Sequence, residues 1–475
     1  MLVKLSCKKQ ATNRKETTEV KRSRAAVRGK ARDALEVRFE AQDLTCFSGL
    51  IVFQRLFARL RLKERLRGCF RHQGSGIYGQ HVVVLMLVVH LLLGFRELRD
   101  TQYYRDDEMV KRLLGLRQLP EVSTVSRTLA GADERSVAHL RAENRRLVLD
   151  RVAQLDLPRI TVDFDGSVQS TGRHAEGTAV GFNKKKKGQR SYYPLFATLA
   201  QTGQALDVHH RPGNVHDSNG AEAFIGQCIE AIRATAPTAQ LETRMDSAFF
   251  SDAIIEAMAE ERVQFTVSVP FERFPPLKDM IEQRRRWRRL DDDVSYFETS
   301  WKPKSWDKRH RFLFVRKRVN RQNKAPLQLD LFVPHEEGYD FKVIVTNKRV
   351  GAKHVAAFHE GRGAQEGIFA ELKSHCHLDY VPVKTLAGNQ TYLLAGLLAH
   401  NLGRELQMTA RPPQRRTTAK RTPLWAFEKL GTLQRKLIQR AGRLLRPAGK
   451  LVLSMNANET VENELLHYLD AVTAA

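Results

Sequence analysis

The sequence predicts an α/β fold that follows a helical region and is interrupted by a β-rich segment. Alternating polar and apolar residues predict five strands, at 159–165, 192–200, 205–210, 240–245 and 264–269. Helices are predicted among these strands, at 220–234 and 251–260. Strands that alternate with helices are typical of a sheet covered by helices.

The N-terminal 38 residues contain many Lys and Arg residues and little apolar material, which predicts a disordered basic arm. The signals from Phe39 to Leu155 are helical. The apolar run from Val82 to Phe95 is too short for the roughly 20 residues that a bilayer core requires, so it predicts a buried helix.

A helix-turn-helix pattern lies near the end of this region. Leu114 closes one helix, Pro120 breaks the chain, and Ser123 or Thr124 caps a second helix that carries Arg127. The pattern has two interpretations: Arg127 contacts DNA, or the two helices are an ordinary pair in a small bundle.

A run of four lysines, Lys184, Lys185, Lys186 and Lys187, predicts a basic turn between strands. It is either a solvated hairpin tip or a clamp on the DNA backbone, because lysine contacts to phosphate add affinity without reading bases.

Residues 271–345 differ in character from the rest. They contain a basic cluster that includes Arg284, Arg285 and Arg286, followed by the aromatic strand-like runs VSYFETSW, RFLFVRKRV and FKVIVTN. This pattern predicts a β-rich insertion. Its aromatic residues either stack on distorted or single-stranded DNA or form the core of a basic subdomain.

Acidic residues follow two of the predicted strands. Alternation along 161–168 places Asp163 and Asp165 on one strand face and Val162 and Phe164 on the other. Asp246 follows the strand at 240–245. Acids from separate strands can meet at one sheet edge, although Asp-Gly at 165–166 also favours a turn and Asp246 also suits a helix cap.

A further acid lies in the segment HEGRGAQEGIFAELK at 359–373. In a helix, Arg362, Glu366 and Lys373 fall within roughly 40° of one another on one face. An acid between two bases suits a site where a carboxylate holds a cation and the bases contact phosphates. The alternative is a solvated face with two ion pairs.

The chain resembles the DDE transposases of bacterial insertion sequences, and most closely the family numbered thirteen-eighty, which is related to the IS-four-type group. The matching segments, in order, are DFDGS at 163–167, GFNKKKKGQRSYYPL at 181–195, RPGNVHDSNGAEAF at 211–224, RMDSAFF at 244–250 and the R-x3-E-x6-K series at 362–373. His359 stands where the related signature usually has Tyr.

This resemblance implies an RNase H-like catalytic core in which three acids bind two divalent metal ions. By position these acids are Asp165, Asp246 and Glu366, with Asp163 as the alternative first acid. Mg²⁺ suits such an oxygen-only site, and Mn²⁺ is the expected substitute. The implied partners are terminal inverted repeats and target DNA, bound as double strands by a homodimer.

Six parts are therefore expected. They are a disordered arm (1–38), a helical DNA-binding region (39–155), the first part of the RNase H-like core (156–270), a β-rich basic insertion (271–345), the second part of the core with the catalytic helix (346–410), and a peripheral basic C-terminal segment (411–475).

Composition independently favours a polyanionic partner. The formal charge is +26 over 475 residues, with a pI near 10.1. Five cysteines without a CxxC pair predict reduced thiols, and His375-Cys376-His377 lacks the second cluster that a zinc site needs. Without a convincing membrane span or secretion signal, we expect a cytoplasmic, nucleoid-associated bacterial protein.

The expected activity is metal-dependent cleavage of DNA at the element ends, followed by strand transfer. Two alternatives remain open on the sequence. One is a metal-dependent nuclease of the same fold that cuts DNA without joining it. The other is an inactive relic that only binds DNA.

Overall fold

The computed structural model describes residues 42–72, 77–181, 183, 186–216, 219–319, 338–415 and 424–474. The predicted arm at 1–38, Lys184 and Lys185 lie outside these residues. Residues 43–475 form one compact unit.

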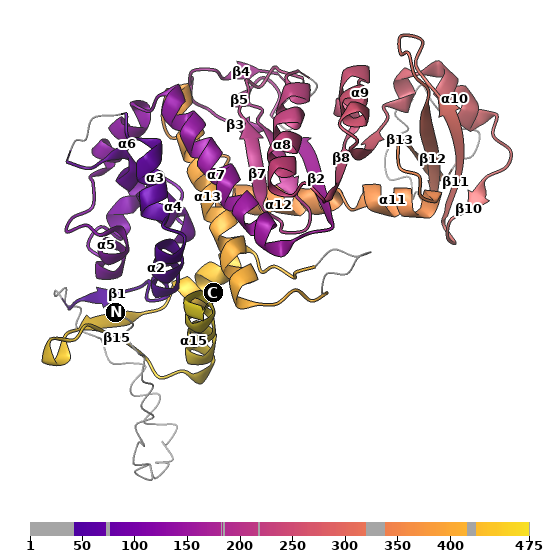
Figure 1. Ribbon diagram of the computed structural model, residues 1–475. Coiled ribbons are helices and arrows are strands. Elements are labelled where there is room, and N and C mark those ends of the chain that lie inside the picture. Colours follow the sequence, from indigo (N-terminus) through magenta and orange to yellow (C-terminus); the bar gives the residue numbers. More distant parts are fainter. Residues whose placement is uncertain are drawn as a thin grey trace, which may run out of the picture. The chain divides into compact units, whose positions relative to one another are not determined.

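A mixed β-sheet of nine described strands runs through this unit in the order β10-β11-β12-β13-β9-β8-β2-β6-β7 (Figure 1). The strands are β2 (Arg159–Gly166), β6 (Leu195–Leu199), β7 (Ala205–His209), β8 (Gln240–Met245), β9 (Gln264–Ser268), β10 (Arg288–Arg289), β11 (Val294–Trp301), β12 (His310–Arg318) and β13 (Tyr339–Thr346). β2, β8 and β9 are parallel to one another, and the remaining neighbours are antiparallel. The mixed α/β class is confirmed.

The five strands predicted between 159 and 269 are all present. The run at 192–200 is divided, because β5 (Arg190–Tyr192) ends just before Pro194, which lacks an N–H for a sheet ladder. β5 forms a separate small sheet with β3 (Gln169–Ser170) and β4 (Ala179–Val180). β2 is not half-buried as expected: Thr161 and Asp163 are as buried as Val162 and Phe164, because both sheet faces are covered.

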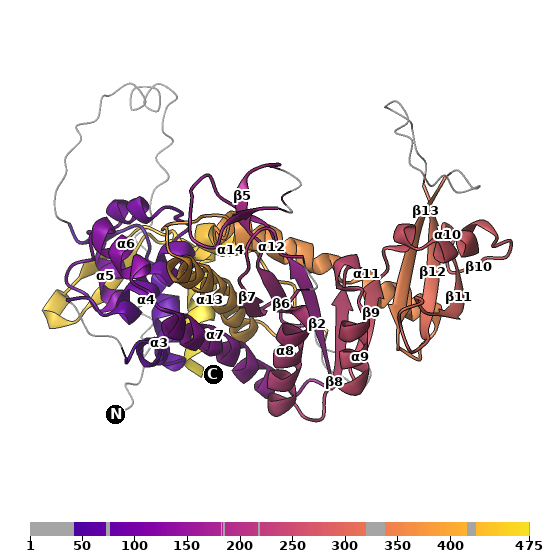
Figure 2. The ribbon, with the colours of Figure 1, turned by 90° about the horizontal axis from the view of Figure 1, so that it is seen from above.

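Helices lie on both sides of β2 and β8, with α8 and α9 on one side and α11 and α12 on the other (Figure 2). Their bounds, with those of the short helices nearby, are α8 (Ala221–Thr235), η2 (Ser247–Phe249), α9 (Asp252–Glu260), η3 (Phe271–Arg273), α10 (Pro275–Glu282), α11 (Ala352–Glu360), α12 (Gly363–His375) and α13 (Leu386–Ala410). Phe164 of β2 packs edge-to-face on Phe224 of α8, with ring centroids 6.0 Å apart. The even-numbered face of β2 thus joins the core under α8, and its odd-numbered face is left for α12.

The region before the sheet is helical, as predicted. Its elements are α2 (Leu50–Arg59), α3 (Leu62–Cys69), α4 (Gln80–Leu92), η1 (Leu98–Tyr103), α5 (Glu108–Leu114), α6 (Val122–Ala130) and α7 (Glu134–Leu155). α4 is buried from Val82 to Leu92 and packs against α13. The predicted cap of α6 is wrong: Glu121 is the capping residue and makes no side-chain cap hydrogen bond. α6 packs against α13 and η1.

The three aromatic runs of the predicted insertion are β11, β12 and β13. β13 pairs with β9, so these strands extend the central sheet instead of forming a separate one. Phe297, Phe312 and Phe314 are buried in the same apolar core as the strands around β2. These three aromatic rings are therefore core residues and are not exposed for stacking on DNA.

The C-terminal segment is not peripheral, and that expectation is wrong. Its elements are α14 (Leu430–Leu433), η4 (Gln434–Ile438), β14 (Gly442–Leu445), η5 (Pro447–Gly449), β15 (Val452–Met455) and α15 (Glu459–Ala474). β14 pairs with β1 (Leu44–Thr45), and α15 packs against α2 and α13. Apolar side chains such as Leu433 and Ile438 are fully buried, which ties this segment to the N-terminal helices.

The cysteines among the described residues are free thiols: Cys46, Cys69, Cys228 and Cys376. Cys376 is fully buried, and burial raises the pKa of its thiol well above its ordinary value. In the described part of the chain, no helix combines the length and the apolar character needed to cross a membrane.

Candidate functional site

Two predicted acids lie at one edge of the central sheet. β2 and β8 are parallel neighbours, and their register places Phe164 opposite Met245. Asp165 and Asp246 are the next residues along the two chains: Asp165 is still paired with Phe196 of β6, and Asp246 directly follows the end of β8. Asp246 also caps η2, because its carboxylate accepts a hydrogen bond of 2.9 Å from the backbone N–H of Ala248.

The third acid reaches this edge on α12. Gln365 donates a hydrogen bond of 3.0 Å to the backbone carbonyl of Asp163, and Arg362 forms an ion pair of 3.1 Å with Asp165. These two contacts fix the first turn of α12 over the end of β2. Glu366, in that first turn, is exposed.

The segment predicted as one helix around 359–373 is divided between α11 and α12 at Gly361 and Arg362. A side chain at position 361 would have to displace Arg244, because its Cβ would lie 2.1 Å from Nη1 of that residue. Arg244 also donates to the carbonyl of Phe358 at 3.2 Å, so it occupies the junction between the two helices. Gly361 and Arg362 keep helical backbone angles, and Arg362 lies beside Asp165.

Asp163 and Asp165 have different environments. Asp163 is 2% exposed, and both its carboxylate oxygens accept hydrogen bonds from Arg244, at 2.6 and 2.7 Å. Burial raises the pKa of Asp163, and the bonds from Arg244 oppose that rise. The side chain of Asp165 is 17% exposed. Asp163 is therefore committed to a buried ion pair between β2 and β8, whereas Asp165 faces the open edge.

The structure brings Asp165, Asp246 and the first turn of α12, which carries Glu366, to one edge of the sheet. Among the described residues, the three possible metal ligands whose ligand atoms lie within 4.8 Å of one another are Asp252, Glu256 and His310. None of these three is a predicted catalytic acid. At the sheet edge, Arg362 supplies the positive charge next to Asp165.

Sequence comparison identifies the family. Residues 27–475 match the profile of the family described as Transposase DDE domain group 1. The chain belongs to this family. A search of curated proteins found no match. A comparison of structures found a cryo-electron microscopy structure of piggyBac transposase in a synaptic complex with hairpin DNA; it has a TM-score of 0.38 and 10% identity, covering 84% of this chain and 82% of that one.

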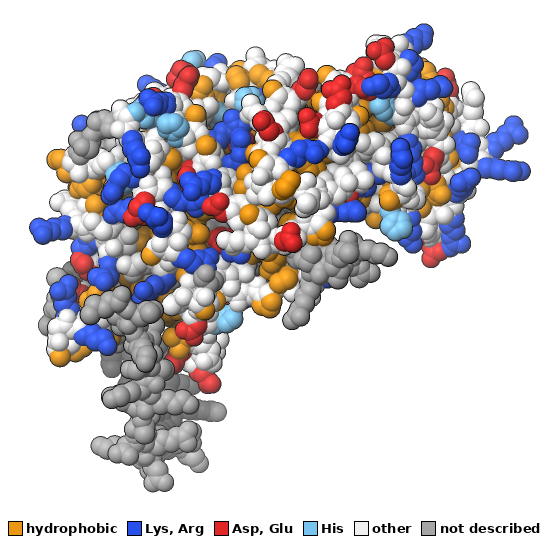
Figure 3. Space-filling view, in the orientation of Figure 1, with side chains coloured by type: hydrophobic (Ala, Val, Ile, Leu, Met, Phe, Trp, Pro, Cys, Tyr) orange, Lys and Arg blue, Asp and Glu red, His pale blue; other side chains and the backbone are white. Residues whose placement is uncertain are grey.

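The predicted DNA-binding residues of this DDE transposase family member lie on several separate elements. Lys186 and Lys187 are exposed between β4 and β5, Arg127 is exposed on α6, and Lys373 is half-buried on α12. The exposed residues between α10 and β10 include Arg284, Arg285 and Arg286. On the face seen in Figure 3, Lys and Arg side chains are spread over the surface instead of forming one patch.

The supporting roles of three residues were not predicted from the sequence: those of Arg244, Gln365 and His359. His359 is buried and shares hydrogen bonds with Ser268 Oγ (2.8 Å) and Thr266 Oγ1 (3.0 Å). Burial, with nearby cations, lowers the pKa of His359 to about 3, so a neutral ring joins α11 to β9. The sequence does contain a signal for Arg244. It lies two positions before Asp246, and residues two apart in a strand lie on the same face.

A second acid on α12, Glu371, was also missed. Its carboxylate accepts hydrogen bonds from Arg404 (2.7 Å) and from the backbone N–H of Leu430 (3.0 Å), and His400 lies 3.4 Å away. Burial acts to raise the pKa of Glu371, but these partners together lower it to about 2. In this family member, Glu371 therefore joins α12 to α13 and to α14.

Proposed function

We propose that this chain is a DNA transposase of a bacterial insertion sequence, similar to the family numbered thirteen-eighty. It would bind the terminal inverted repeats of its element, cut the DNA and transfer the strands to target DNA. The main support is the convergence of Asp165, Asp246 and the first turn of α12 on one sheet edge, in a chain that belongs to a DDE transposase family.

The proposed catalytic core is RNase H-like, with Asp165, Asp246 and Glu366 as the acids that hold two Mg²⁺ ions or their Mn²⁺ substitutes. The donor set fits these ions, because all three side chains offer carboxylate oxygens. Bound there, the ions would activate water or a terminal hydroxyl and stabilise the leaving oxygen of an in-line displacement. The Asp163–Arg244 pair would hold β2 and β8 in register, and Gln365 would fix the position of Glu366.

DNA contacts are proposed for the exposed basic residues. Lys186 and Lys187, together with Lys184 and Lys185 outside the described residues, would form a clamp on DNA phosphates. The cluster Arg284, Arg285 and Arg286 would bind DNA further away, and Arg127 would contribute to end recognition. Lys373 and Arg362 would contact phosphates on either side of the cleaved bond. A homodimer on DNA would hold two ends together.

The test is an assay of purified protein on the genomic DNA that flanks its own gene, with Mg²⁺, with Mn²⁺ and with a chelator. We expect metal-dependent cleavage at inverted repeats and products in which 3′ ends are joined to target DNA. Cleavage without joining would instead indicate a nuclease. Binding without cleavage under any metal condition would indicate a relic and would contradict the proposal.

A further inference from the structure

We propose that Asp252, Glu256 and His310 form a second divalent-cation site, separate from the candidate catalytic acids. The ion would be a transition metal of the Zn²⁺ class, and it would join α9 to the start of β12. This inference does not depend on the proposed transposase activity.

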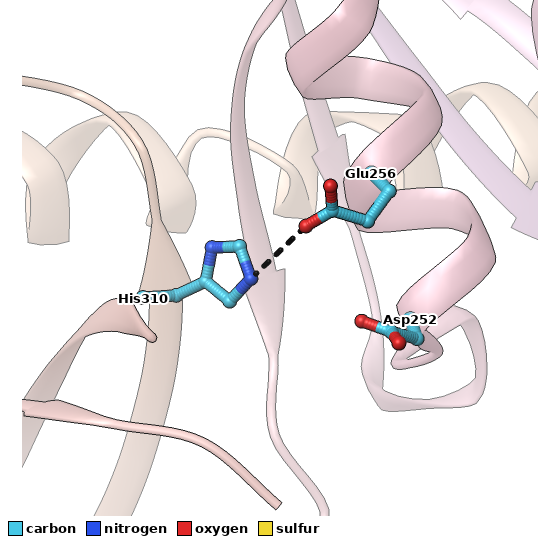
Figure 4. Close-up of side chains that lie close together, drawn as sticks. All are labelled: Asp252, Glu256 and His310. Carbon is cyan, nitrogen blue, oxygen red and sulfur yellow. Dashed lines mark ion pairs between the residues drawn. The ribbon is translucent and has the colours of Figure 1, made fainter. Parts of the chain in front are cut away.

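The three side chains are arranged as a ligand set. Asp252 and Glu256 are four residues apart on α9 and therefore share one helix face. His310 is the first residue of β12 and points toward them (Figure 4). One ligand atom of each residue lies within 4.8 Å of the other two.

The distance between His310 and Glu256 matches the distance between two ligands of one metal ion. His310 Nε2 lies 3.6 Å from Glu256 Oε1, which is too long for a hydrogen bond. Two ligands of a tetrahedral ion with bonds of about 2.05 Å are separated by about 3.4 Å. The spacing suits an ion between the two atoms better than a direct bond.

A second observation is that the three ligand atoms lack hydrogen bonds, although Glu256 Oε1 and His310 Nε2 form an ion pair. Asp252 Oδ1, Glu256 Oε1 and His310 Nε2 are buried, and none has a hydrogen-bond partner in the described part of the chain. The side chain of His310 is 10% exposed. Buried polar atoms without partners are rare because each costs free energy, and here three of them face one point. A single cation would satisfy all three.

The imidazole is also prepared to bind metal. Its ring packs edge-to-face on Trp306, which in turn packs on Phe250, with ring centroids 5.8 Å and 4.7 Å apart. Burial lowers the pKa of His310, against the opposing effect of Glu256 and Asp252. The aromatic contact with Trp306 holds the imidazole in place beside α9.

The ammonium group of Lys308 would compete with a metal ion for Glu256. Lys308 pairs with Oε2 of Glu256, and its side chain is 66% exposed. Its ammonium group neutralises part of the charge that would attract a cation. One nitrogen and two oxygen ligands favour Zn²⁺ over Mg²⁺, which prefers an all-oxygen shell. The ion would hold the 302–309 connection against α9, the helix that begins six residues after Asp246.

The test is calorimetric titration of the full chain with Zn²⁺, in a background carrying Asp165→Asn, Asp246→Asn and Glu366→Gln so that the candidate catalytic acids do not contribute. We expect one Zn²⁺ per chain at this site. His310→Gln and Glu256→Gln should each weaken that binding at least about tenfold. Lys308→Met should strengthen it, because the competing cation is removed.

The matched control is Glu260→Gln, one turn further along the same helix, which should leave the affinity unchanged. Circular dichroism of each variant separates lost binding from lost folding, and Asp252→Asn provides an isosteric third ligand variant. The proposal is overturned if Zn²⁺ does not bind stoichiometrically, or if folded His310→Gln and Glu256→Gln variants bind it as tightly as the background chain.

Discussion

The two faces of α12 carry the same residue type in opposite environments. Glu366, in the first turn, is exposed at the edge where β2 and β8 end. Glu371, five residues later, is 4% exposed and bound by Arg404, His400 and the N–H of Leu430. The buried acid has its hydrogen-bonding capacity filled by protein, which suits a structural role. The exposed acid keeps the capacity that a metal ligand requires.

The largest expected effect comes from Glu366→Gln. Removal of one of three ligand carboxylates should lower DNA cleavage by at least about a thousandfold, because the metal contribution is worth several kcal/mol. Stability should change by no more than about 0.5 kcal/mol, since the side chain is exposed. Rates of cleavage and urea unfolding, measured on the same preparation, test this. Cleavage at the wild-type rate would remove Glu366 from the site.

Glu371→Gln should have the opposite effects: a large loss of stability and little loss of cleavage. Loss of the buried charge leaves Arg404 without its ionic partner, and broken buried pairs of this kind cost about 3–5 kcal/mol. The free energy of unfolding should fall by about that amount, while the folded fraction should still cleave DNA. Urea denaturation checks the prediction, with Glu366→Gln as the matched control on the same helix. Equal stability of the two variants would show that the Glu371 cluster has no net effect.

The stability due to Glu371 should also depend on pH. Its pKa is lowered to about 2 in the folded protein from 4.5. The stabilisation is therefore complete above pH 4.5 and is lost as the pH falls toward 2. The stability difference between wild type and Glu371→Gln should therefore shrink by roughly half between pH 7 and pH 3. Urea midpoints of both proteins across that range measure it, and a constant difference would refute the assigned charge state.

The smallest expected effect concerns phosphate contacts on α12. Lys373→Ala should weaken binding to a terminal-repeat duplex and reduce the slope of log affinity against log salt by about 0.9. Arg362→Ala should change the slope less, because Asp165 already balances that charge. Salt-titrated binding measures both, and Lys353→Ala on the exposed face of α11 is the control. A wild-type slope in Lys373→Ala would exclude a phosphate contact at this position.

Much of the fold was predictable because it depends on local patterns. Alternation and apolar runs located β2, β8 and β9 as well as the helices beside them, and the aromatic runs located β11 to β13. The pairing of β13 with β9 was not predictable, because register between distant strands leaves no local signal. The burial of Leu433 and Ile438 was missed for a similar reason: their partners are far away in the chain.

In the candidate site, too, features with a local sequence pattern were predictable, and contacts between distant residues were not. The positions of Asp165 and Asp246 at strand ends followed from the alternation. The different environments of Asp163 and Asp165 did not, because they depend on Arg244 reaching across from the parallel strand. The division between α11 and α12 was also missed, as was the close approach of Arg244 to the backbone there. Such contacts require the three-dimensional register that local patterns do not contain.

The most direct test of this account compares Asp165→Asn with Asp163→Asn, using cleavage of one terminal-repeat substrate together with urea unfolding. Asp165→Asn should lose cleavage by at least about a thousandfold and remain folded, because a ligand oxygen is lost at the open edge. Asp163→Asn should lose about 3 kcal/mol of stability, because Arg244 is left buried without its partner, and should keep cleavage in the folded fraction. Wild-type cleavage by Asp165→Asn, with a folded but inactive Asp163→Asn, would contradict the account.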